Sequence, residues 1–525
     1  MGKIHITGVL IFFIFLLAGC GDDEGPSVQP PALTGNSMTY SLVSKSDPNI
    51  SGTVEFAERD DGVTIIEINL NGTSAGGDHP SHIHSNNAAD GGPIILDLTN
   101  VDGGTGTSMT EVSALNDGTP VSYNDLINID GYINVHLSGS DLATLIAQGD
   151  VGQNELSGIS QVYPLDSRSD PNIMGTATFA ERLNGETLVT VALQGTEAGG
   201  DHPSHIHANT AAEGGGIVID LTNVAGETGL SATNITETND GTPLTYADLI
   251  DFDGYINVHL SQDNLGTLVA QGDIGQNALT GSSEDYSLFS KSDPGVSGMA
   301  TFAERVNGET LVTIQLSGTS AGGDHPAHIH ANTAAEGGAV VISFNNVDGE
   351  SGTSSTNVSQ LNDETPITYS ELLEFNGYIN VHLSGANIAT LIAQGDIGQN
   401  ELTENSVEYP LNPVSNPAIS GTATFAERNN GFTLITIQLE GTTDGGDHPS
   451  HIHENDAATG GGILISLTNV DGATGTSNTS VTMLNDGTEI TYSELIVFNG
   501  YINVHLSSTN LSTLVAQGNI GANAD

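Results

Sequence analysis

Apolar and polar residues alternate with a period of two along much of the chain. Ile66, Ile68 and Leu70 are separated by Glu67 and Asn69. Because successive side chains of a strand point to opposite faces, this pattern buries one face and exposes the other. Turns rich in glycine and aspartate, such as Asn-Asp-Gly at 116–118, separate strands of about six residues. The pattern predicts an all-β fold of antiparallel, immunoglobulin-like β-sandwiches.

One short helix is expected to interrupt the strands. Ser122 is followed three residues later by Asp125, which is the spacing of a capping box. The same spacing recurs as Thr245 and Asp248, Thr368 and Glu371, and Thr491 and Glu494. We expect each box to open a helix of about two turns.

The chain repeats itself every 123 residues. Equivalent tyrosines stand at Tyr40, Tyr163, Tyr286 and Tyr409, and no insertion breaks the register. A unit of this length is long enough to fold alone, so we expect four tandem domains with short linkers such as 156–162. The expected boundaries are 1–19 for a leader, 20–37 for a flexible tether, and 38–160, 161–283, 284–406 and 407–525 for the four repeats.

The N-terminus has the features of an export signal. Lys3 precedes an apolar run from Val9 to Leu17, and Leu-Ala-Gly-Cys follows at 17–20. These four residues resemble the lipobox of bacterial lipoproteins, in which the cysteine, here Cys20, carries the lipid. An ordinary signal peptide is the alternative. The acidic residues at 22–24 resemble the surface-export signal of Bacteroidota lipoproteins. The resemblance implies an exported protein, anchored by lipid to the outer membrane or cell envelope and displayed at the cell surface.

Composition limits the possible partners. Cys20 is the single cysteine, so an exported chain makes no internal disulfide and each domain depends on its own core. The formal net charge is −56, and removing the leader takes away Lys3 and no acidic residue, which leaves 64 acidic and 7 basic residues. Such a surface repels phosphate backbones, so nucleic acid is excluded. The acidity suits solubility in a saline environment better than a diffuse cation site.

The histidines are the candidate chemistry. Apart from His5 in the leader, all of them lie in two motifs of each repeat, Asp-His-Pro-(Ser/Ala)-His-Ile-His and Gly-Tyr-Ile-Asn-Val-His-Leu. His82 and His84 share a strand face, and inward-facing Ile133, Val135 and Leu137 would turn Tyr132, Asn134 and His136 outward. If the two strands pair, two or three of these imidazoles converge on the outer surface and suit Zn²⁺ or Cu²⁺. The candidate ligands are His82, His84, His136, His205, His207, His259, His328, His330, His382, His451, His453 and His505.

A further histidine of each repeat precedes a proline at a turn. His79, His202, His325 and His448 are either fourth ligands or, in the interpretation that we favour, supporting hydrogen-bonding residues. The alternative for all four histidines of a repeat is a structural role, as half-exposed residues bonded to neighbouring carbonyl groups. Repeats made by duplication would retain such residues in any case.

The motifs resemble the CHRD domain of chordin and of many bacterial secreted proteins. The likeness rests on His-Ile-His at 82–84, the strand after Gly91-Gly92, and Tyr-Ile-Asn-Val-His at 132–136. It covers most of each repeat. The family typically has threonine where this chain has Leu137, and an arginine that the ending Ala147-Gln148-Gly149 lacks. The resemblance implies tandem CHRD-like modules in a lipoprotein.

A more distant likeness is to copper/zinc superoxide dismutase, itself a β-sandwich. His-Pro-Ser-His-Ile-His at 79–84 is similar to a strand of that enzyme. The resemblance implies that His82, His84 and His136 match three copper ligands and that His79 braces them. Equivalents of the bridging histidine and the zinc ligands are missing, Leu145 stands in place of the substrate-guiding arginine, and Gln148 in place of a disulfide cysteine. The acidic surface also repels superoxide.

Two function classes therefore remain open. The first is a non-catalytic, lipid-anchored surface binding protein whose four modules give avidity toward an extracellular partner, a glycan or metal ions. The second is a copper-dependent redox enzyme of the dismutase type. A structural stalk is a third possibility. No serine lies in a nucleophile-elbow setting. The arginine of each Phe-Ala-Glu-Arg, such as Arg59, is expected to pair with Glu58 or with a carboxylate across the sheet.

Overall fold

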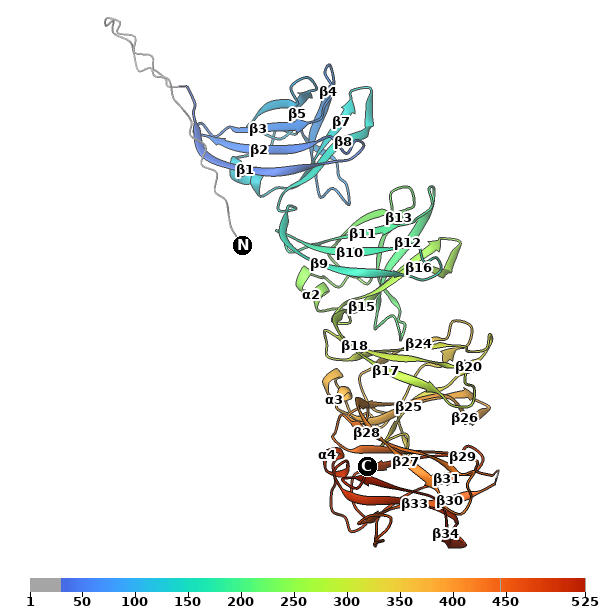
Figure 1. Ribbon diagram of the computed structural model, residues 1–525. Coiled ribbons are helices and arrows are strands. Elements are labelled where there is room, and N and C mark those ends of the chain that lie inside the picture. The colour runs from blue at the N-terminus through green and yellow to red at the C-terminus, as the bar shows by residue number, and fades with distance from the viewer. Residues whose placement is uncertain (1–29, 444, 525) are drawn as a thin grey trace, which may run out of the picture. The chain divides into compact units, whose positions relative to one another are not determined.

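The computed structural model describes residues 30–443 and 445–524, and it is all-β apart from one short helix in each repeat (Figure 1). The predicted leader at 1–19 and Cys20 lie outside these residues. The predicted tether at 20–37 is too long, because the first strand already begins at Leu33, and the backbone amide of Ala32 donates to the Asp60 carboxylate.

The first repeat sets the pattern for the others. Its strands alternate buried and partly exposed residues, and Ile66, Ile68 and Leu70 are buried as predicted. Its elements are β1 (Leu33–Ser44), β2 (Ser51–Arg59), β3 (Thr64–Asn71), β4 (Asp78–Ser85), β5 (Ile94–Asp102), β6 (Thr107–Val112), α1 (Tyr123–Ile127), β7 (Asp130–Ser138) and β8 (Asp141–Gly152).

These strands form a closed antiparallel barrel in the order β1-β2-β3-β6-β5-β4-β7-β8. Two neighbouring strand pairs in the ring share only a few paired residues. β1 pairs with β8 at Val43–Gln148 and Ser44–Ala147. β5 pairs with β6 only at Asp102–Thr107. The predicted two-layer sandwich is therefore not confirmed. Alternation predicts one buried face for each strand, and a barrel interior satisfies that pattern as well as a sandwich does.

The second repeat is also a closed barrel with the equivalent strand order. Its elements are β9 (Leu156–Ser167), β10 (Met174–Arg182), β11 (Thr187–Gln194), β12 (Asp201–Ala208), β13 (Ile217–Ala225), β14 (Leu230–Ile235), α2 (Tyr246–Ile250), β15 (Asp253–Ser261) and β16 (Asn264–Gly275). The expected linker at 156–162 is wrong, because it forms the first half of β9. The side chains of 156–162 are exposed, so this part of the strand carries no alternating pattern that would identify it.

The third and fourth repeats form eight-stranded sheets in the same order, but the strands equivalent to β5 and β6 lie at the two ends and are not paired. In the third repeat, β20 and β23 form a separate two-stranded sheet. The third comprises β17 (Leu279–Ser290), β18 (Ser297–Arg305), β19 (Thr310–Ser317), β20 (Asp324–His325), β21 (Ala327–Ala331), β22 (Val340–Ser343), β23 (Val347–Asp348), β24 (Thr353–Val358), α3 (Tyr369–Leu373), β25 (Asn376–Ser384) and β26 (Asn387–Gly398). The fourth comprises β27 (Leu402–Pro413), β28 (Ser420–Arg428), β29 (Thr433–Glu440), β30 (Asp447–Glu454), β31 (Ile463–Asp471), β32 (Thr476–Val481), α4 (Tyr492–Leu495), β33 (Asn499–Ser507) and β34 (Asn510–Gly521).

All four predicted capping boxes are present. In α1, the Ser122 side chain accepts from the Asp125 amide and the Asp125 side chain accepts from the Ser122 amide. The three other helices have the same reciprocal bonds. The helices are shorter than the expected two turns, with four or five residues each, because the chain re-enters a strand soon after the cap. No helix among the described residues is long and apolar enough to cross a membrane.

Apart from Arg182–Asn184, the second to fourth repeats fall within one compact unit. In this unit a buried arginine joins the third repeat to the second, and another joins the fourth to the third. The Arg305 guanidinium of β18 donates to the Asp273 carboxylate of β16 at 2.8 Å, to the Asn357 side chain at 2.7 Å and to the Asn277 carbonyl. The Arg428 guanidinium of β28 donates to the Asp396 carboxylate of β26 at 2.8 Å. The partner of Arg305 and of Arg428 is thus a carboxylate of the preceding repeat and not the adjacent glutamate. Arg59 pairs instead within its own repeat, with Asp61 and with Glu111 on β6 across the sheet, as expected. That each repeat folds alone stays a prediction.

Candidate metal centre

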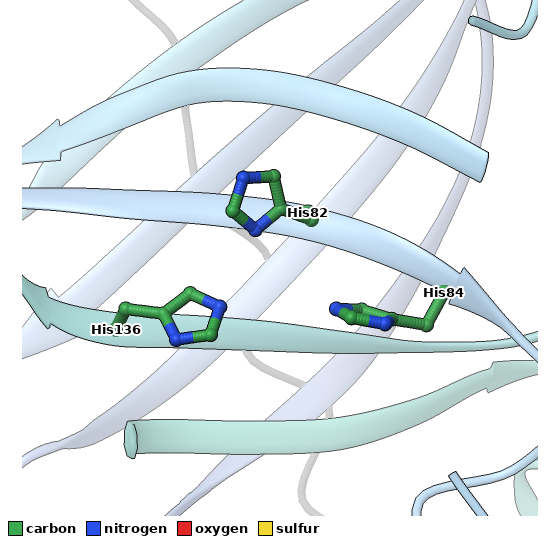
Figure 2. A group of neighbouring side chains, drawn as sticks. All are labelled: His82, His84 and His136. Atoms are coloured by element: carbon green, nitrogen blue, oxygen red, sulfur yellow. The ribbon is translucent and has the colours of Figure 1, made fainter. Parts of the chain in front are cut away.

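Each repeat brings three histidines together on the side of its strands that faces away from the core. His82 and His84 lie on β4 and His136 on β7, and the two strands pair with His82 opposite Asn134. Ile83, between the two β4 histidines, is fully buried in the core. Figure 2 shows the three imidazole rings with one nitrogen of each turned toward the space between them.

The same geometry recurs in all four repeats. One ring nitrogen from each histidine lies within 4.8 Å of the other two in the groups His82, His84 and His136; His205, His207 and His259; His328, His330 and His382; and His451, His453 and His505. These are the twelve ligands that the sequence predicts. The side chains could therefore hold four metal ions.

In β7, the strand that carries His136, the orientation of the last side chains differs from the prediction. Tyr132, Asn134 and His136 lie on the face of β7 that is turned away from the core, as predicted. They are nevertheless buried, with exposures of at most 7 %. Leu137 was expected inside and is 42 % exposed. The register between β7 and β8 shifts on both sides of His136, so the alternation breaks there. This bulge turns Leu137 outward.

Backbone carbonyl groups fix the tautomer of two ligands. The Nδ1–H of His136 donates to the Leu142 carbonyl at 2.6 Å, and the Nδ1–H of His84 donates to the Gly92 carbonyl at 2.8 Å. Nε2 is then the unprotonated nitrogen in both rings, which is the form that binds a metal. Equivalent bonds hold the histidines of the other repeats.

The environment of His84 supports this assignment. Asn134 is oriented by Gln148, whose side-chain amide donates to the Asn134 oxygen at 2.8 Å. The Asn134 nitrogen then faces His84 Nε2 at 3.4 Å, as it would face a lone pair. Tyr132 stacks on the His84 ring with centroids 4.8 Å apart, and its hydroxyl accepts from the Gly92 amide. Sequence analysis missed this support, although Tyr132 and Asn134 stand within the second histidine motif.

His82 presents its other nitrogen. Its Nδ1 is buried and makes no hydrogen bond to any described residue, and its Nε2 lies 3.7 Å from the Asp97 carboxylate. Burial lowers the pKa of His82 and that of His136, and a protonated His136 lowers the pKa of His82 further, while Asp97 acts in the opposite direction. Neutral rings are favoured on both counts. Neutral imidazoles are the form required of ligands.

His79 is not part of the triad. It is 4 % exposed, and its Nδ1–H is shared between the Leu137 carbonyl at 2.8 Å and the His136 carbonyl at 3.2 Å. These bonds tie β4 to the bulged end of β7, where the ligand His136 sits. His202, His325 and His448 make the corresponding contact. These four histidines are not among the residues whose nitrogens converge in each repeat, and their supporting role stays a prediction.

Comparison with known proteins adds little. No family model matches the chain, and no curated protein does. The CHRD resemblance therefore gains no support. A solved structure described as "Biofilm associated protein - BSP domain" matches over 96 % of this chain and 100 % of its own length, with 12 % identity and a TM-score of 0.15. A similarity at this level supports no inference about function.

Proposed function

We propose that this protein is a non-catalytic metal-binding array in which each repeat holds one divalent transition-metal ion. The observation that supports the proposal is the convergence of three imidazole nitrogens in every repeat, with two of the three tautomers set by backbone carbonyl groups. Zn²⁺ and Cu²⁺ both accept imidazole ligands readily. His82 would contribute Nδ1, and His84 and His136 would contribute Nε2. Because His84 Nε2 has one lone pair, the metal would replace its contact with the Asn134 amide.

Three protein ligands leave room for a further one. Structural zinc sites are closed by four protein ligands, whereas sites with three keep a position for water or for a donor from another molecule. The array would therefore bind a partner through its metal ions, or would capture the ions themselves. Four sites on one chain strengthen attachment to any surface that presents repeated donors.

Tetrahedral binding sets the distance between the three ligand nitrogens. A zinc ion with metal–nitrogen distances of about 2.0–2.1 Å places its ligand nitrogens roughly 3.3 Å apart. The nitrogens in the structure lie within 4.8 Å of one another, so a pair at that limit would approach by about 1.5 Å on binding zinc. His82, with a side-chain exposure of 15 % and Nδ1 without a bond to the described residues, is the ring that can turn.

Metal analysis of the purified chain tests the proposal. We expect about four equivalents of Zn²⁺ or Cu²⁺ after loading and exhaustive dialysis. Replacing His82 and His84 by asparagine should remove one equivalent, and the corresponding changes in the other repeats should each remove another. Asp78→Asn is the matched control, because it alters an exposed side chain of the same strand that bonds to Asn100 and lies outside the triad. Metal content near zero, or equal loss in the control, would refute the proposal.

The dismutase-type alternative uses the same histidines. Three neutral ligands and a free position are compatible with copper chemistry, but the net charge of −56 repels the superoxide anion. Loading the chain with Cu²⁺ and following superoxide decay separates the two functions. We expect a rate no greater than that of the same concentration of free copper. A faster rate that is lost in His136→Asn would establish the enzyme.

Attachment to the cell envelope is the second part of the proposal. It rests on the lipobox-like residues that end at Cys20 and on the acidic residues after them. We propose that lipid at Cys20 holds the array at the outer surface. Metabolic labelling with a fatty acid tests this, and Cys20→Ser should abolish the label. Protease added to intact cells should then degrade the repeats if they are displayed outside.

A further inference from the structure

The four candidate metal sites differ at one position beside the first ligand. The residue opposite His82 on β5 is Asp97, and the residue opposite His205 on β13 is Asp220. In the third and fourth repeats the same register position holds serine. Ser343 lies opposite His328, and Ser466 lies opposite His451.

The two aspartates are placed to contact the outward nitrogen of the histidine. His82 Nε2 lies 3.7 Å from Asp97, and His205 Nε2 lies 3.8 Å from Asp220. In both rings the other nitrogen, Nδ1, is buried on the side of the triad and lacks a hydrogen-bond partner among the residues that the structure covers. The arrangement in these repeats is thus carboxylate, imidazole and then the space between the three rings.

The serines are engaged elsewhere. The hydroxyl oxygen of Ser343 accepts from the Asn362 side chain at 3.2 Å, and that of Ser466 accepts from Asn485 at 3.3 Å. His328 and His451 still have a buried Nδ1 without a partner in the described part of the chain. The third and fourth repeats therefore keep the ligand and lack the carboxylate behind it.

We infer that the chain carries two classes of metal site, with tighter binding in the first and second repeats than in the third and fourth. The inference rests on the proposed function. A carboxylate beside the distal N–H of a ligating histidine fixes its tautomer and makes the ligand nitrogen more basic, and loss of such a partner typically lowers affinity about 10- to 100-fold. Asp97 and Asp220 are each 69 % exposed, so the lower end of that range, roughly tenfold, applies here.

The experiment is a titration of the full chain with Zn²⁺ in competition with a chromophoric chelator. The wild-type chain should show two tighter and two weaker sites. The variant with Asp97→Ser and Asp220→Ser should show four sites of the weaker class, and the variant with Ser343→Asp and Ser466→Asp should show four of the tighter class. None of these variants replaces one of the candidate ligands.

The outcomes separate this inference from the proposed function. Absence of zinc binding would refute both. Four equal sites in the wild-type chain would overturn the two classes and leave metal binding standing. A split that persists unchanged when the aspartates and serines are exchanged would also overturn the inference, because the difference in affinity would then have another origin.

Discussion

Replacing Arg305 by alanine should be among the most destabilising single changes in the chain. The Arg305 side chain is fully buried, and its partner Asp273 is only 12 % exposed. Alanine would leave that carboxylate without its counter-ion, with the Ala211 amide as its remaining hydrogen bond to a described residue. Breaking a buried ion pair on one side typically costs about 3–5 kcal/mol. We expect a loss in that range from the unfolding free energy of the compact unit that contains repeats two to four.

The first repeat supplies a matched control. Arg59 stands at the equivalent position but is 17 % exposed, and it pairs within its own repeat with Asp61 and Glu111, which are 34 % and 61 % exposed. Water already screens these charges. Arg59→Ala should therefore cost much less than Arg305→Ala.

Urea unfolding followed by far-ultraviolet circular dichroism measures both changes. Arg305→Ala should also separate one transition into two, because the contact between repeats two and three is lost. The double variant Arg305→Met with Asp273→Asn should recover more than half of the loss, since it leaves no unpaired buried charge. Asparagine is compatible with this position, because Asn519 occupies it in repeat four and still accepts from the Ala457 amide. Equal losses for Arg305→Ala and Arg59→Ala would refute the reasoning.

Three further predictions concern pH, the helix caps and the metal centre. Burial lowers the pKa of His82 and His136 below the usual value of about 6.5, and the equivalent ligands of the other repeats shift the same way, so the unfolded chain binds more protons near pH 6. The metal-free chain should therefore lose stability as the pH falls from 7 to 5, and a melting temperature that stays level or rises over that interval would contradict this. Ser122→Ala removes one half of a capping box and should cost about 1 kcal/mol in urea unfolding, whereas an unchanged midpoint would show that the cap is unimportant. Gly92→Ala would place its Cβ 2.0 Å from the Ser85 carbonyl oxygen and so displace the carbonyl group that holds His84. It should weaken zinc binding in the first repeat alone, and four unchanged sites would argue against that role.

Much of the candidate site could be predicted from the sequence because it depends on local periodicity. His82 and His84 stand two residues apart in a strand, so they share a face wherever that strand lies. Ile83 must then face the core, as it does. The repeat of 123 residues and the four capping boxes were equally accessible, since each depends on spacing within a short segment. Local spacing thus identified the twelve candidate ligands, whereas their meeting in four groups depends on the pairing of two strands in each repeat.

Other features needed the tertiary structure because they join residues that are distant in sequence. Alternation showed that one face of each strand is buried, but strand pairing closed the first and second repeats into barrels. A bulge beside His136 reversed the expected orientation of Leu137. The partner of Arg305 belongs to the preceding repeat, 32 residues earlier in the chain, and no local pattern indicates it.

The sequence alone therefore determined the repeat, the strand character and the identity of the histidines that share a face. Only the tertiary structure decided that β4 and β7 are neighbours, which carbonyl groups orient the imidazoles, and which repeats have a carboxylate behind the first ligand. The physical reason is that a period of two fixes the direction of each side chain relative to its own strand. Which strands become neighbours is decided by pairing and packing across the whole repeat.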